Sequence, residues 1–196
     1  MYNFNREEAD LTKSLVHPYV PRFPRHVSYD LVLFGSWRRK GVYVGEKQIA
    51  SPGSYPVAGF NFAPMYNLNY KLRFGVSLDG VYDGSANVYT EDALVEYDAG
   101  SGSSRRKFLV PGIQNQLALG LSGRAEYVMP FFTIGVGLGT NVLGRGNLRG
   151  LYQVFALKIN VTRSSFLHIG YNLQDFQTPN YLMLGLGFRF NNKYPK

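Results

Sequence analysis

The sequence predicts an all-β protein, an antiparallel up-and-down transmembrane β-barrel of about eight strands. Apolar and polar residues alternate with a period of two over segments of mostly about 10 to 13 residues, a length that can cross a bilayer. Long and short connections alternate between these segments. Charged residues make up only 17% of the chain and aromatic residues 15%, with 22 glycines. Aromatic residues suit strands and interfacial belts, and glycine suits close barrel walls.

The N-terminal residues differ from the rest of the chain. With 196 residues, the chain is expected to form one domain. Residues 1–24 are predicted to be irregular, because residues 17–24 include three prolines, which disrupt helices and central strands. Residues 25–196 are predicted to form the barrel domain. The first residues lack the basic start and apolar core of an export signal, so we expect that a segment needed for export precedes them.

The first four strands are predicted over residues 27–37, 57–66, 70–82 and 112–122. Strand 70–82 has the clearest division, because Leu72, Phe74 and Val76 share one face while Lys71 and Arg73 share the other. Each of the other three segments also alternates apolar residues with polar or small ones, which indicates a strand with two different faces.

The last four strands are predicted over residues 127–138, 151–162, 166–175 and 181–190. In the final one, Leu182, Leu184 and Leu186 oppose Gly185 and Arg189. This strand ends on the aromatic run at 188–190, and outer-membrane barrels often end on an aromatic residue. No segment reaches the roughly 20 apolar residues of a membrane helix.

The connections indicate which end of the barrel faces outward. Long ones are predicted at about 38–56, 83–111 and 139–150, and short ones at 67–69, 123–126 and 163–164. The seventh, at 176–179, is short and breaks the pattern. Outer-membrane barrels have long extracellular loops and short periplasmic turns. The pattern therefore predicts a bacterial outer-membrane location with both termini in the periplasm.

The apolar strand faces are expected to point outward into lipid. Every backbone polar group must be paired there, which requires a closed barrel. The polar faces would then line an interior with room for side chains and little more, which argues against a pore. The side chains expected to pair inside are Asp30, Lys71, Arg73, Asp79, Lys158 and Arg189. A soluble lipocalin-like barrel with apolar faces inward is the alternative, but strand length and loop asymmetry favour the membrane protein.

Basic residues exceed acidic ones, giving a net charge of +8. They are scattered rather than arranged as a basic stripe with interleaved aromatic residues, so nucleic acid is not an expected partner. Two clusters fall at strand ends, where they are predicted to contact anionic lipid headgroups or lipopolysaccharide phosphates; solvated loop charges are the alternative. These residues are Arg38, Arg39, Lys40, Arg105, Arg106 and Lys107.

Few residues could carry catalytic chemistry. The chain has no cysteine and only three histidines, which excludes disulfides, thiolate metal sites and cysteine nucleophiles. His17 and His26 lack metal-ligand partners at useful spacing, so neither a metal nor a cofactor is expected. His168 lies mid-strand on a polar face and is the candidate general base. The alternative is a structural histidine in the barrel interior.

Two C-terminal stretches, 166–173 and 179–190, resemble the ends of Bacteroidetes outer-membrane proteins called acyloxyacyl hydrolases, grouped with the lipid A 3-O-deacylase family. Residues 2–6 resemble the tail of a strand that follows the family's catalytic motif. The resemblance implies hydrolysis of an acyl ester of lipid A by a serine, a histidine two residues before it, and an acidic residue on the next strand. Here His168 matches the histidine, Gly170 stands at the serine position, and the acidic position falls near Leu182.

Two functional hypotheses follow for a membrane barrel. The first is an outer-membrane barrel of the lipid A deacylase type, with outer-membrane lipid and lipopolysaccharide as partners and His168 as the catalytic candidate. The second is a non-enzymatic outer-membrane barrel that has a structural role or binds through the long loops at 38–56 and 83–111. The sequence leaves the oligomeric state open.

Overall fold

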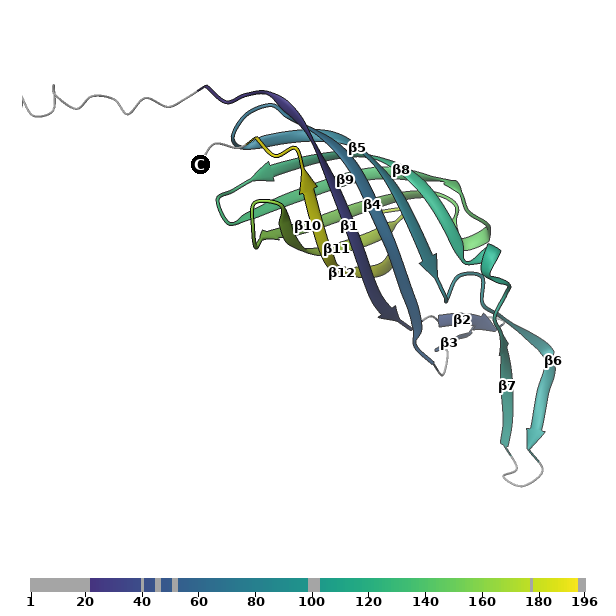
Figure 1. Ribbon diagram of the computed structural model, residues 1–196. Helices are drawn as coiled ribbons and strands as arrows, with labels where there is room; N and C mark the ends of the chain where they lie inside the picture. Colours follow the sequence, from purple (N-terminus) through teal and green to yellow (C-terminus); the bar gives the residue numbers. More distant parts are fainter. Residues whose placement is uncertain are drawn as a thin grey trace, which may run out of the picture.

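The computed structural model describes residues 22–39, 41–44, 47–50, 53–98, 103–176 and 178–193. It is a closed antiparallel barrel in the order β1-β12-β11-β10-β9-β8-β5-β4 (Figure 1). The predicted fold class is therefore confirmed. The barrel strands are β1 (His26–Arg38), β4 (Tyr55–Asn67), β5 (Leu72–Asp83), β8 (Leu117–Val128), β9 (Phe132–Leu143), β10 (Leu151–Asn160), β11 (Ser165–Gln174) and β12 (Thr178–Phe190). Of the segment 1–24 that was predicted to be irregular, residues 1–21 lie outside the described residues.

The two ends of the barrel differ, as predicted. Tight turns at 68–71, 129–131 and 161–164 join strands at one end, called the turn end below. Connections at 39–54, 84–116, 144–150 and 175–177 join strands at the other, called the loop end. Two loops contain hairpins, one of β2 (Gly41–Val44) and β3 (Lys47–Ala50), the other of β6 (Tyr89–Asp98) and β7 (Ser103–Leu109). Figure 1 shows the β6–β7 hairpin projecting away from the barrel.

Helices play a small part in this fold. The described residues include the short 3₁₀ segments η1 (Ile113–Asn115) and η2 (Gly146–Leu148), both in loop-end connections. Among the described residues, no helix has the length and apolar character needed to cross a membrane.

Two predicted strands were placed too early in the chain. The predicted strand 112–122 is β8 at 117–128, and the predicted strand 127–138 is β9 at 132–143. The predicted turn at 123–126 lies inside β8, because alternation continues through it: Arg124 and Glu126 are buried inside, while Tyr127 is exposed outside. Lys71 was also wrongly placed, since it is exposed in the turn before β5.

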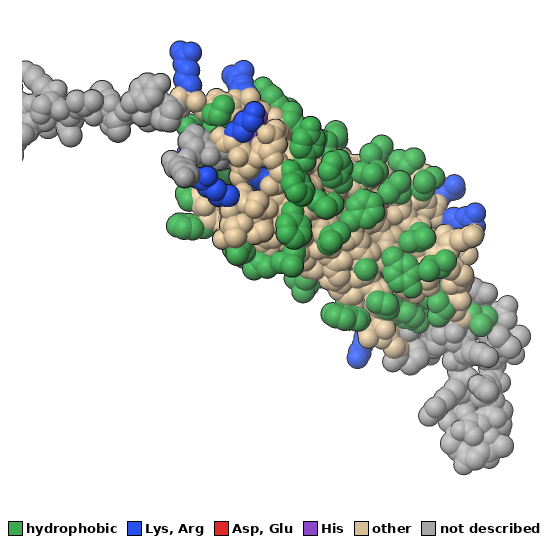
Figure 2. All heavy atoms as spheres, viewed as in Figure 1, with side chains coloured by type: hydrophobic (Ala, Val, Ile, Leu, Met, Phe, Trp, Pro, Cys, Tyr) green, Lys and Arg blue, Asp and Glu red, His purple; other side chains and the backbone are tan. Residues whose placement is uncertain are grey.

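The outward face is apolar along the barrel. Side chains such as Leu33, Phe74 and Leu184 point outward and are about half exposed. On the face drawn in Figure 2, hydrophobic side chains form a broad band, and Lys and Arg side chains gather near the two ends. A soluble monomer rarely exposes so large a continuous apolar surface, whereas a barrel that spans lipid requires one. The predicted orientation of the strand faces is therefore confirmed.

Candidate functional site

Five charged side chains meet inside the turn-end half of the barrel, and we call them the charge cluster: Asp30, Arg73, Glu126, Lys158 and Arg189. The Asp30 carboxylate accepts hydrogen bonds from Arg73 Nη2 at 2.8 Å, Lys158 Nζ at 2.8 Å and Arg189 Nε at 2.9 Å. Glu126 accepts from Arg73 Nε and Lys158 Nζ, each at 2.7 Å. Buried charges are tolerated when paired in this way.

The charge cluster confirms that Asp30, Arg73, Lys158 and Arg189 lie inside and pair with each other. Sequence reasoning missed Glu126, because it fell in the wrongly predicted turn. The unbroken period of two from residue 117 to 127 was the signal that could have placed it on the inward face.

An aromatic ring covers part of the charge cluster. Phe166 is only 2% exposed, and its ring centroid lies 5.0 Å from Lys158 Nζ and 5.2 Å from Arg189 Cζ. At this range the electron-rich ring face attracts both cations. Gly187 faces the same ring, and a Cβ atom there would overlap it. This part of the interior is therefore tightly filled.

A second polar group occupies the middle of the barrel around Asp79. Its carboxylate accepts hydrogen bonds from Arg124 Nη2 at 2.8 Å, Ser122 Oγ at 2.7 Å and Tyr152 Oη at 2.7 Å. Asn61 Nδ2 donates to it at 2.8 Å. Asp79 was predicted to lie inside and pair, and this is confirmed; Arg124 was missed for the same reason as Glu126.

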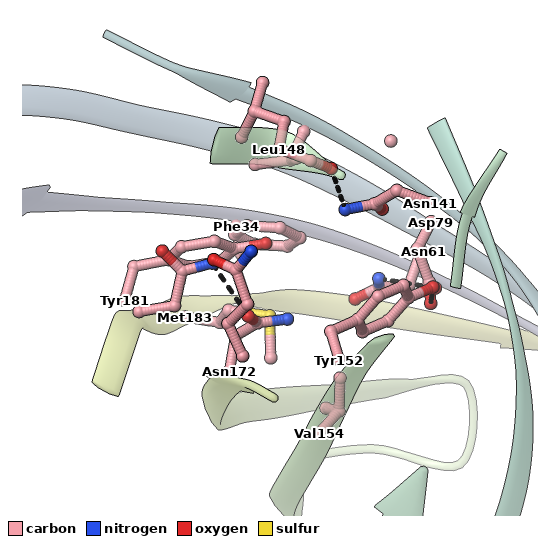
Figure 3. Close-up of a pocket in the computed structure, with 14 residues that line it drawn as sticks. Phe34, Asn61, Asp79, Asn141, Leu148, Tyr152, Val154, Asn172, Tyr181 and Met183 are labelled. Carbon is pink, nitrogen blue, oxygen red and sulfur yellow. Dashed lines mark hydrogen bonds between the residues drawn. The ribbon is translucent and has the colours of Figure 1, made fainter. Parts of the chain in front are cut away.

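Asp79 also lines a small cavity in the barrel interior (Figure 3). Labelled lining residues include Phe34, Tyr152, Asn172, Tyr181 and Met183. The cavity volume is about 20 Å³, which holds about one water molecule. An acyl chain does not fit into this space, so the cavity is not a site for a lipid substrate.

His168 points into the interior and is 1% exposed. Its cross-strand partners are Lys158 on β10 and Gly185 on β12. Within the described part of the chain, neither ring nitrogen of His168 has a hydrogen-bond partner. A general base that activates a hydroxyl needs that hydroxyl and an orienting carboxylate within hydrogen-bond reach. The described residues give His168 neither.

The other two positions implied by the family resemblance do not complete a triad. A Cβ atom on Gly170 would lie 2.8 Å from His168 Nε2 and 2.5 Å from Met183 Cε, so a serine there would force these side chains apart. Leu182 is 42% exposed and points outward, away from the interior where His168 lies. The acidic position and the histidine therefore face opposite sides of the barrel wall.

The predicted headgroup contacts lie at the loop end in different settings. Arg38 turns inward, with Nη1 3.1 Å from Asp83 Oδ2 and a further hydrogen bond to Asn180. Arg39 is exposed, and Lys40 lies outside the described residues. Residues 105–107 belong to β7 of the projecting hairpin, where Arg105 pairs in register with Glu96 on β6. The contact of these residues with lipid stays a prediction.

Metal-binding groups do not gather in the described residues, where no set of three or more His, Cys, Asp or Glu side chains could hold an ion. His26 has a structural role at the turn end, because its Nε2 accepts from the Lys193 N–H at 3.1 Å and its Nδ1 lies 2.7 Å from the Pro24 carbonyl oxygen. His17 lies outside the described residues.

Comparison with known proteins identifies one family. A family model described as "Acyloxyacyl hydrolase, C-terminal domain" matches residues 27–192. No curated protein matches the chain. The chain is also similar to a solved structure of Ail, the attachment invasion locus protein of Yersinia pestis, in complex with the heparin analogue sucrose octasulfate. The TM-score is 0.41 and the sequence identity is 14%, and the match covers 86% of this chain and 100% of the Ail chain. The predicted family resemblance is confirmed, while the Bacteroidetes origin stays a prediction.

Proposed function

The chain belongs to the acyloxyacyl hydrolase C-terminal-domain family, and from this membership we propose that it is an outer-membrane barrel that binds lipid A without cleaving it at His168. The observation that carries the proposal is the placement of the three family positions. His168 is buried inside the barrel, Gly170 replaces the nucleophile, and Leu182 faces outward. Ester hydrolysis of this kind needs all three groups on one side of the wall.

The outer-membrane location is supported by the apolar outward band and by the difference between the two ends. Long connections on one end and tight turns on the other are the pattern of outer-membrane barrels. In this orientation the loop end faces outside the cell, where lipopolysaccharide phosphates lie. We propose that positive charge there comes from Arg39, Lys40, Arg105, Arg106 and Lys107, and that the exposed Arg39 contacts headgroups directly. The charge of Arg38 is compensated by its ion pair with Asp83.

Mass spectrometry of lipid A tests the proposed chemistry. Refolded protein is incubated with purified lipid A, beside the variants His168→Ala and Gly170→Ser. The expected spectra are the same as that of untreated lipid A in all three cases, because no nucleophile reaches His168 and a serine at position 170 meets the imidazole and Met183. Heat-dependent gel mobility serves as the check that each barrel has folded.

One result would overturn the proposal. In that result, the unmodified protein removes an acyl group from lipid A while the His168→Ala variant does not. His168 would then be catalytic, and its position inside the barrel would not be its position in the active protein. Removal of an acyl chain by Gly170→Ser alone would also contradict it, because that result would mean that the histidine can activate a neighbouring serine.

A further inference from the structure

The exposed charged side chains at the turn end are all basic among the described residues. They come from the segment before β1, from the turns before β5 and β11, and from the residues after β12. Figure 2 shows Lys and Arg side chains gathered at this end of the barrel. Exposed carboxylates that would balance them are absent there from the part of the chain that the structure describes. The five cations are Arg22, Arg25, Lys71, Arg163 and Lys193.

The interior just below the turn end also has an excess of positive charge. In the charge cluster, the three cations Arg73, Lys158 and Arg189 share the two carboxylates of Asp30 and Glu126. Arg189 pairs with Asp30 alone, through Nε at 2.9 Å and Nη2 at 3.3 Å. Its Nη1 group has no hydrogen-bond partner among the described residues and is not enclosed by them. Arg189 therefore has N–H donors that remain available to a further anion.

A cavity in the turn-end mouth of the barrel joins the exposed and the buried cations. Its volume is about 560 Å³, which is within the range of about 300–1,000 Å³ of small-molecule sites. The turns at 68–71, 129–131 and 161–164 contribute to its walls. Lys71, Arg163 and Arg189 line it, and the described lining includes no acidic residue. We call this space the turn-end cavity.

Backbone hydrogen bonds fix the turns that carry the two exposed cations of the turn-end cavity. The N–H of Val128, at the end of β8, donates to the Lys71 carbonyl oxygen at 2.6 Å. The N–H of Arg189 on β12 donates at 2.7 Å to the carbonyl oxygen of Ser164, which follows Arg163. The turns are therefore attached to neighbouring strands, and the fold itself brings the three cations to one cavity.

We propose that the turn-end cavity binds a phosphate group, with Arg189 Nη1 as the donor at its floor and Lys71 and Arg163 at its rim. A phosphate group carries its negative charge on several strong acceptor oxygens, and the planar guanidinium of arginine matches these oxygens. A cavity lined by charges of one sign concentrates ions of the opposite sign. Val128 and Val161 add apolar lining, which suits a phosphate ester with an apolar part.

This phosphate has two sources. In the proposed orientation the turn end faces the periplasm, where the headgroups of inner-leaflet phospholipids lie level with the rim and free phosphate enters from water. The apolar part of the lining favours the phospholipid headgroup. The inference goes beyond the proposed function, because the cavity lies at the opposite end of the barrel from the loops and uses neither His168 nor Gly170. Binding there does not depend on lipid A.

Isothermal titration calorimetry of the folded full chain in a maltoside detergent, which carries no phosphate, tests this site. The two titrants are inorganic phosphate and a short-chain phosphatidylglycerol below its critical micelle concentration. The site variant combines Lys71→Gln with Arg163→Gln. The matched control combines Lys193→Gln with Arg25→Gln, which removes the same two kinds of charge from exposed positions at the same end, outside the cavity lining.

The unmodified chain is expected to bind both titrants saturably. The dissociation constants should rise about 10-fold in the site variant, the effect of two partly screened charge contacts, and less than about 2-fold in the control. Arg189→Lys keeps a cation near Asp30 but removes the guanidinium fork, so it should also weaken binding. Tighter binding of phosphatidylglycerol than of phosphate would identify the headgroup as the ligand, and equal binding would identify free phosphate.

Two results would overturn the turn-end cavity as a phosphate site. The first is the absence of saturable binding of either titrant by the folded chain. The second is an equal loss of binding in the site variant and the control, because the general charge of this end would then attract the phosphate. Neither result bears on the lipid A measurements, so cleavage of lipid A would contradict the proposed function without touching this inference.

Discussion

Replacing Asp30 with asparagine is expected to lower the free energy of unfolding by about 3–5 kcal/mol, the usual cost of breaking a buried ion pair from one side. Asp30 is 1% exposed and accepts hydrogen bonds from Arg73, Lys158 and Arg189. Without its charge, Arg73 and Lys158 keep only the carboxylate of Glu126, and Arg189 loses the carboxylate with which it pairs. Urea unfolding of the protein in lipid vesicles measures the change.

The control for this variant is Asp175→Asn, which removes a carboxylate from an exposed position after β11. Its effect is expected to stay within about 0.5 kcal/mol, as for most surface substitutions. Equal effects of the two variants would mean that the charge cluster contributes no more to stability than a surface charge, which would contradict the arrangement described for the interior.

Replacing Phe166 with alanine is expected to lower the free energy of unfolding by about 3–5 kcal/mol, the range for removing a buried aromatic ring. The ring lies under the cations of Lys158 and Arg189 and fills the space left by Gly187. Its loss creates a cavity beside charged groups and removes both cation–π contacts. The measurement is again urea unfolding in vesicles.

Phe188→Ala is the matched control, because Phe188 lies on the neighbouring strand and points outward with 41% exposure. Lipid tails can fill the space left by this ring, so its loss is expected to cost clearly less than the loss of Phe166. If Phe188→Ala were the more destabilising variant, the inward and outward faces of β11 and β12 would have been exchanged.

The period of two predicted most of the barrel, because each strand has one lipid-facing side and one interior side. It placed the outward apolar residues and the interior positions of Asp30, Arg73 and Lys158 correctly. It failed at Gly123 and Arg124, which have the composition of a turn. The buried partners of Arg124 and Glu126 on other strands decide the conformation there, and a local pattern does not include these long-range contacts.

The loops limited the prediction of side-chain burial, and side-chain packing limited that of the candidate site. Gln153 is one example. The alternation of residues along β10 places it on the outward face, but it is buried, and the connection after β11 contacts it through the Phe176 N–H. There Asp175 and Phe176 adopt left-handed backbone conformations, with φ of 49° and 60°. Non-glycine residues seldom adopt such angles, so the alternation pattern predicted a short connection at 176–179 but not this backbone conformation. The alternation of residues along β11 predicted that His168 points inward. The lack of space between Gly170 and the His168 ring follows from side-chain packing in the folded barrel, which the alternation does not describe.

The fluorescence of Trp37 tests the central claim, that the outward face of this barrel lies in lipid. Trp37 is the only tryptophan, and it is 78% exposed on the outward face at the loop end of β1. In vesicles, lipids brominated near the headgroup should quench its fluorescence strongly, lipids brominated near the chain end less, and aqueous iodide far less than in the urea-unfolded chain. Full quenching by iodide with none by either brominated lipid would place this face in water and contradict the account.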